Sequence, residues 1–91
     1  MIDTTATPYR VTAAMTYATA AELLTQGKAL IGGGETVFDL AGVSAADSAS
    51  LAVILGWQRA AAGQGRVRLT NLPANIRSLA ELYGIADLLP V

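Results

Sequence analysis

The stretch that decides the fold runs from residue 38 to residue 51 and reads Phe38-Asp39-Leu40-Ala41-Gly42-Val43-Ser44-Ala45-Ala46-Asp47-Ser48-Ala49-Ser50-Leu51. Its first half is mainly apolar and favours a buried β-strand, and small residues then predict a turn. Asp47 and Ser48 stand where a helix is expected to begin, because both residue types accept hydrogen bonds from the free N–H groups of a first helical turn. The stretch therefore predicts a strand, a turn and a helix in succession.

The rest of the chain continues this alternation. Hydrophobic patterns predict strands over residues 9–15, 36–43 and 67–72, and helices over residues 20–30, 48–62 and 73–83. Thr19 is the expected N-cap of the first helix because Glu22 follows three residues later. The strand over 36–43 reads as one buried on both faces. Residues 1–8 are predicted to form a frayed edge strand limited by Pro8, and residues 85–91 an apolar tail packed on the sheet.

This order predicts a single α/β domain over residues 1–91, with helices layered on a parallel or mixed sheet. The chain is 53% hydrophobic and 14% charged, against about 25% charged residues in a typical protein, so we expect a globular domain with spare apolar surface. A net charge of −1 gives no basic patch for nucleic acid. No apolar run is long enough to span a bilayer and the N-terminus lacks signal-peptide features, so a cytoplasmic location is expected.

Catalysis is not expected. The chain has no His and no Cys, which removes the commonest general base, the thiol nucleophile and most zinc ligands. Gly32-Gly33-Gly34 follows a predicted helix instead of preceding one, and it lacks the Gly-Lys-Ser/Thr ending of a phosphate-binding loop. We therefore predict no metal site, no cofactor and no directly bound nucleotide.

The predicted helix over 48–62 carries one charged residue, Arg59, and is too apolar to hide all its sides in a small core. Helical periodicity places one apolar set on one side of this helix, consisting of Leu51, Ile54, Leu55, Gln58 and Ala62. Val53 and Trp57 lie on another side with Ser50 beside them. Trp57 either packs within the domain or anchors a partner, since tryptophan is common at interface hot spots. Ala49, Gly56 and Ala60 would let another helix approach closely.

Asp47 and Ser48 also have two possible roles. In the first, one of these two residues caps the helix. Ser48 could in addition be a recognition or phosphorylation point, because a phosphate is favourable at the positive end of a helix. Such a phosphate would place negative charge on an apolar surface and disrupt docking there.

Residues 38–43 and 46–55 together resemble the signature of the STAS family, and the similarity extends from about Tyr9 to the C-terminus. Within that family the chain is most similar to the small, MlaB-like STAS subunit of the bacterial Mla phospholipid-transport ABC complex, whose ending resembles the segment from Leu79 to Pro90. The resemblance implies a mixed sheet of four to five strands with three or four helices mostly on one face. It also implies partner binding without catalysis.

By this resemblance the chain would dock on the cytoplasmic ATPase subunit of a transporter that maintains lipid asymmetry. It would meet the permease and the inner membrane only through that complex. The expected contacts are Asp47, Ser48, Ala49, Ser50, Val53 and Trp57. The alternative is an anti-sigma-factor antagonist switched by phosphorylation of Ser48. Its family motif Gly-Glu-Leu-Asp is replaced here by Ala13-Ala14-Met15-Thr16, which favours the transporter subunit.

Overall fold

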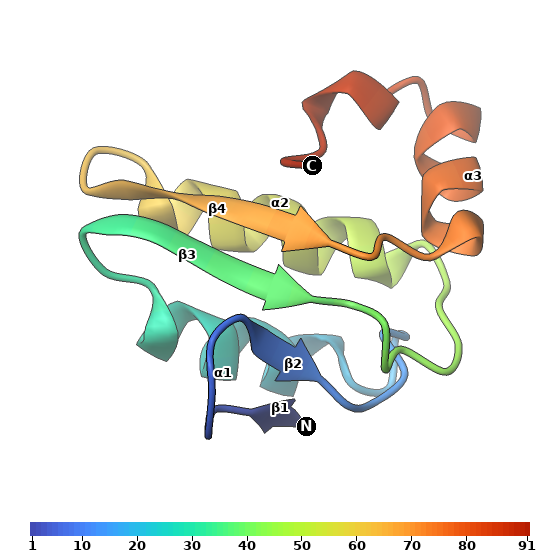
Figure 1. The fold of residues 1–91 in the computed structure, drawn as a ribbon. Helices are drawn as coiled ribbons and strands as arrows, with labels where there is room; N and C mark the ends of the chain where they lie inside the picture. Colours follow the sequence, from blue (N-terminus) through green and yellow to red (C-terminus); the bar gives the residue numbers. More distant parts are fainter.

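The computed structural model describes residues 1–91 and contains one four-stranded sheet (Figure 1). The strands are β1 (Ile2–Asp3), β2 (Tyr9–Val11), β3 (Gly34–Asp39) and β4 (Gly65–Thr70), and they lie in the order β1-β2-β3-β4. β1 runs antiparallel to β2, whereas β2, β3 and β4 are parallel. The predicted α/β class and mixed sheet are confirmed, and residues 1–8 supply the expected short edge strand.

Helices cover one face of this sheet. Figure 1 shows α1 (Ala20–Leu30) and α2 (Ala49–Ala61) behind the strands, where each connects two parallel neighbours. α3 (Ala74–Leu82) and the short 3-10 helix η1 (Ala86–Leu88) stand at the end where β4 finishes. The predicted tail does pack on the sheet, because Leu89 is buried and the Pro90 carbonyl accepts a hydrogen bond from the Leu69 N–H at 2.7 Å.

β2 and β3 end well before the predicted residues 15 and 43, and β4 ends at Thr70 instead of at residue 72. β2 stops at Val11 and β3 stops at Asp39, although an isolated parallel bridge joins Met15 to Ala46 further on. The Asp39 carboxylate accepts a hydrogen bond from the Ala41 N–H at 2.9 Å, which turns the chain away from the strand. Gly42 then passes so close to β2 that a Cβ there would lie 2.7 Å from the Val11 carbonyl oxygen. Local turn chemistry therefore ends these strands.

The prediction that the strand over 36–43 is buried on both faces is wrong. Thr36 and Phe38 face the helices and are buried, but Glu35 and Asp39 point to the uncovered face. Alternation along a strand sends neighbouring residues to opposite faces, so a strand that carries these carboxylates has one polar side. The sheet is therefore covered on one side only.

α1 and α2 are in close contact with each other. Gly27 of α1 lies against the indole of Trp57, and Gly56 of α2 lies against the side chain of Leu24. The small residues of α2 do permit a close helix approach, and the approaching helix is the chain's own α1. Thr19 stands at the predicted N-cap position but makes no cap hydrogen bond. Its hydroxyl instead donates to the Ala14 carbonyl at 2.7 Å.

Candidate functional site

Asp47 ties together the starts of α1 and α2. One carboxylate oxygen accepts a hydrogen bond from the Ala49 N–H at 2.9 Å, and the other accepts from the Tyr17 N–H at 3.0 Å. The first bond satisfies one of the free N–H groups at the start of α2. The second spans thirty residues of sequence and fixes the segment before α1. Asp47 therefore acts as a structural clamp between the two helices.

Ser48 is exposed and makes no cap hydrogen bond. Of the two residues predicted to cap α2, Asp47 does so. The Ser48 hydroxyl is left available at the positive end of the helix dipole, where an incoming acceptor or anionic group would be favoured. The Ser48 hydroxyl can therefore be reached both by a partner protein and by a modifying enzyme, as its two predicted roles require.

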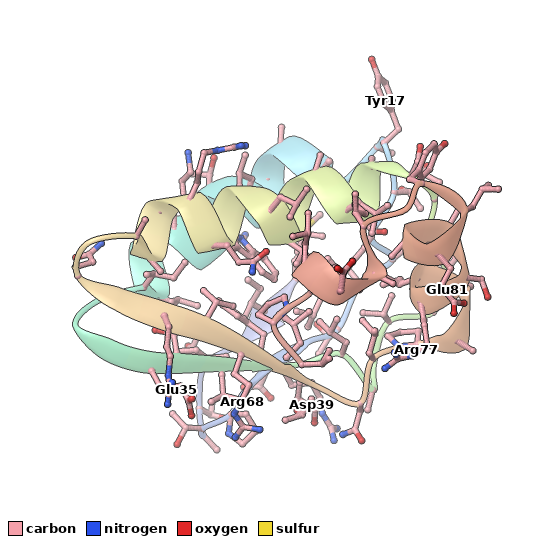
Figure 2. The ribbon with its side chains drawn as sticks, turned by 90° about the horizontal axis from the view of Figure 1, so that it is seen from above. Tyr17, Glu35, Asp39, Arg68, Arg77 and Glu81 are labelled. Atoms are coloured by element: carbon pink, nitrogen blue, oxygen red, sulfur yellow. The ribbon has the colours of Figure 1, made fainter.

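A shallow hollow of about 670 Å³ surrounds Ser48 at the N-terminal ends of the two helices. It is lined by Tyr17, Ala20, Ala21, Ser48, Ala49 and Ala52. The Tyr17 side chain is 88% exposed and points away from the helix layer (Figure 2). An aromatic ring beside small residues is a suitable anchor for another protein, because it offers a large contact area at little entropic loss. We call this surface the serine hollow.

Sequence reasoning missed Tyr17. Three of its neighbours in the hollow, Ser48, Ala49 and Ala52, lie at the start of α2, some thirty residues further along the chain, and only the tertiary structure brings them beside Tyr17. The available signal was weak: an aromatic residue in the polar segment just before a helix.

Three of the predicted contact residues are buried, and this corrects their expected role. Ser50 and Trp57 are 0% exposed and Val53 is 1% exposed, so none of their side chains is available to a partner in this structure. The Trp57 ring stacks on Phe38 with ring centroids 4.2 Å apart, and its Nε1–H donates to the Leu23 carbonyl at 3.2 Å. The buried side of α2 is therefore wider than predicted: Leu51 and Ile54 of the predicted core side are buried, and the side that carries Val53 and Trp57 is buried too, because α2 packs against α1 as well as against the sheet.

The uncovered face of the sheet carries compensated charges. Glu35 pairs with Arg66 at 3.2 Å and with Arg68 at 3.3 Å. Asp39 accepts a hydrogen bond from Asn71 at 3.0 Å and lies 3.8 Å from Arg10. Glu35, Arg68 and Asp39 all lie on the side opposite Tyr17 (Figure 2).

Asp39 is held in its charged form. Its pKa lies below the ordinary value, first because Asn71 donates a hydrogen bond to the carboxylate and then because the Ala41 N–H does so. Arg10 lowers the pKa further. Hydrogen bonds to a carboxylate stabilise the ionised state. The role of Asp39 is therefore structural: its carboxylate holds the chain in place at the end of β3.

The structure contains no group of three His, Cys, Asp or Glu side chains that could hold a metal ion. No helix is both long and apolar enough to cross a membrane.

A four-stranded mixed sheet with helices on one face is the architecture of a STAS fold. The family model described as "Mlab, STAS domain" matches residues 5–90, and the chain belongs to that family. No curated protein matches this sequence. The resemblance to MlaB-like STAS domains is therefore confirmed, and domains of this family are in general non-catalytic.

Proposed function

We propose that this chain is a non-catalytic STAS subunit of an ABC transporter for phospholipid, and that it docks on the ATPase subunit through the serine hollow. The observation that carries the proposal is the exposed Ser48 in a hollow lined by alanines and flanked by the protruding Tyr17. A surface of this kind offers apolar contact area around one hydroxyl, which suits protein recognition better than a small substrate. The family membership supports the same role.

In this role the ATPase binds and hydrolyses the nucleotide, and the STAS chain supports its assembly or activity. The chain would reside in the cytoplasm and reach the inner membrane only through the ATPase and the permease. The transporter as a whole would maintain the lipid asymmetry of the outer membrane. The expected contacts are Ser48, Ala49 and Tyr17, with Asp47 holding the two helix ends in place.

The test is co-purification with an ABC-transporter ATPase subunit of the same organism. Ala52→Arg places a long charged side chain in the serine hollow and should abolish the complex. Ala62→Arg is the matched control, because Ala62 is also exposed and stands just after α2, outside the hollow. If Ala52→Arg binds as well as Ala62→Arg and both are folded by circular dichroism, the hollow is not the docking surface.

The second candidate is an anti-sigma-factor antagonist switched at Ser48. The exposed hydroxyl at a helix start favours it, because a kinase can reach such a group. Incubation with ATP and the candidate kinase, followed by mass spectrometry, separates the two functions. A phosphate that is added to the wild type and lost in Ser48→Ala supports the antagonist, whereas capture of the ATPase by unmodified protein supports the transporter subunit.

A further inference from the structure

The serine hollow lies at the N-terminal ends of α1 and α2. At the other end of the same helices a second depression of about 400 Å³ is lined by Leu24, Lys28, Gly56, Arg59 and Ala60. Helical periodicity puts Ala20, Ala21, Leu24 and Lys28 on one side of α1, and Ala49, Ala52, Gly56 and Arg59 on one side of α2. The two depressions therefore follow one another along a single surface, which we call the helix-pair groove.

Between the two depressions, Gly56 allows the Leu24 side chain of α1 to pack closely against α2. Gly56 lies so close to α1 that a Cβ there would be 2.5 Å from the Leu24 Cδ1 atom. Between residues 49 and 59 of α2 the groove extends for about 15 Å at 1.5 Å per residue, roughly three helical turns. A length and shape of this kind suit a helix laid into a groove, because small residues allow two backbones to approach closely.

The two ends of the groove differ in charge. Lys28 is the only lysine of the chain and Arg59 is the only charged residue of α2. Neither makes an ion pair, a property that they share only with Arg77 of α3, whereas Arg10, Arg66 and Arg68 are all paired with carboxylates on the uncovered sheet face. No carboxylate lines either depression of the groove.

Helix dipoles explain only part of this arrangement. Both cations stand in the last turn of their helices, where positive charge is favoured. That effect does not fix the direction of the side chain around the helix axis. The dipole therefore does not account for the fact that both cations border the same groove and leave their charges uncompensated.

We propose that the helix-pair groove receives an amphipathic helix of the ATPase subunit, oriented by its charge. Its apolar side chains would contact Tyr17 and the alanines of the serine hollow, and an acidic side chain would lie between Lys28 and Arg59. This inference rests on the proposed function and adds to it the chemistry of the partner segment. Charge at the rim of an interface mainly sets the association rate, the salt dependence and the orientation of binding.

The first experiment measures the affinity of the purified chain for the purified ATPase subunit between about 50 mM and about 500 mM NaCl, a range over which exposed charges become screened. The variant is Lys28→Gln/Arg59→Gln. The control is Arg66→Gln/Arg77→Gln, which changes the net charge equally but alters one residue on the sheet face and one on α3. We expect the first pair to bind about tenfold more weakly at low salt and to lose most of the salt dependence. The control should behave as wild type.

A second experiment identifies the acidic partner residue. A carbodiimide joins a carboxylate to an amine without a spacer, so only carboxylates in contact with an amine react. Because Lys28 is the only lysine, a cross-linked peptide that contains it reports directly on the groove. We expect Lys28 to be joined to an Asp or Glu within an amphipathic helical segment of the ATPase, and Lys28→Arg to abolish this product while retaining binding.

The outcomes separate the two levels of the proposal. If the complex forms and Lys28→Gln/Arg59→Gln retains wild-type affinity and salt dependence, the charge-oriented groove is refuted while the proposed function stands. A cross-link from Lys28 to a segment that cannot form an amphipathic helix also overturns the inference. If the wild-type chain captures no ATPase at all, the proposed function fails and this inference fails with it.

Discussion

Substitution of Gly27 by Ala tests the arrangement of the core most directly. At an ordinary position inside a helix this change is stabilising, because alanine is favoured over glycine by about 1 kcal/mol. At Gly27, however, the new Cβ would overlap the pyrrole ring of Trp57. The structure therefore predicts that the sign of the effect is reversed.

The magnitude follows from what must move. Overpacking a dense core destabilises by about 1–3 kcal/mol. The displaced indole would also lose its 3.2 Å hydrogen bond to the Leu23 carbonyl, and a buried donor left without a partner costs about 1–3 kcal/mol. After the gain in helix propensity is subtracted, we expect a loss of about 1–5 kcal/mol in the free energy of unfolding. That is a large part of the roughly 5–15 kcal/mol that stabilises a typical domain.

The assay is urea unfolding followed by far-ultraviolet circular dichroism. Gly56→Ala is the matched control, since its Cβ would meet the end of the flexible Leu24 side chain, which can rotate away. This control should lie within about 1 kcal/mol of wild type. In a double-mutant cycle with Trp57→Leu, the penalty of Gly27→Ala should shrink because the indole is absent. A Gly27→Ala protein as stable as wild type would refute the placement of Trp57 against α1.

The remaining predictions concern the helix starts, the hollow and the uncovered sheet face. Asp47→Ala should lower the free energy of unfolding by about 1–2 kcal/mol, whereas Ser48→Ala should change it by less than about 0.5 kcal/mol in the same urea titration; equal effects would contradict the capping role of Asp47. Tyr17→Ala should leave the thermal midpoint unchanged but weaken ATPase binding about tenfold, and a variant with unchanged affinity would remove Tyr17 from the interface. The lowered pKa of Asp39 in the folded state means that its stabilising contribution is complete above its unfolded pKa of about 3.9 and is lost as the pH falls through its folded pKa. The free energy of unfolding should therefore fall less steeply with decreasing pH in Asp39→Asn than in the wild type. An NMR titration of Asn71→Ala should give a higher pKa for Asp39 than in the wild type. An unchanged pKa would show that Asn71 is not the main cause of the lowered value.

Much of the fold was predictable because its signals are local. The strand that contains Phe38 and the helix that begins after Asp47 and Ser48 are each specified by apolar periodicity and turn residues within about ten positions. The wrong details have non-local causes. β3 was expected to be covered on both faces, but its carboxylates pair with arginines of β2 and β4, and those partners are known only once the strand order is known.

The residues of the candidate site also divide into those predictable from local sequence and those that depend on contacts distant in the chain. Ser48 was identified from its position at a helix start, and its exposure agrees with that placement. Trp57 was assigned to a partner surface because an angular plot of one helix cannot reveal that α1 packs against α2 and encloses the indole. Tyr17 was overlooked because its position beside Ser48 depends on the hydrogen bond from its N–H to Asp47, thirty residues away.

The amino-acid sequence by itself therefore determined the alternation of strands and helices, the absence of catalytic His and Cys, and the position of Ser48 at the start of a helix. These properties depend on residue type and short-range spacing. Only the tertiary structure decided which side of α2 is buried, that Tyr17 flanks the serine hollow, and that Lys28 and Arg59 border one groove. Each of these depends on how two helices pack against each other, and that packing is set by contacts between residues about thirty positions apart in the chain.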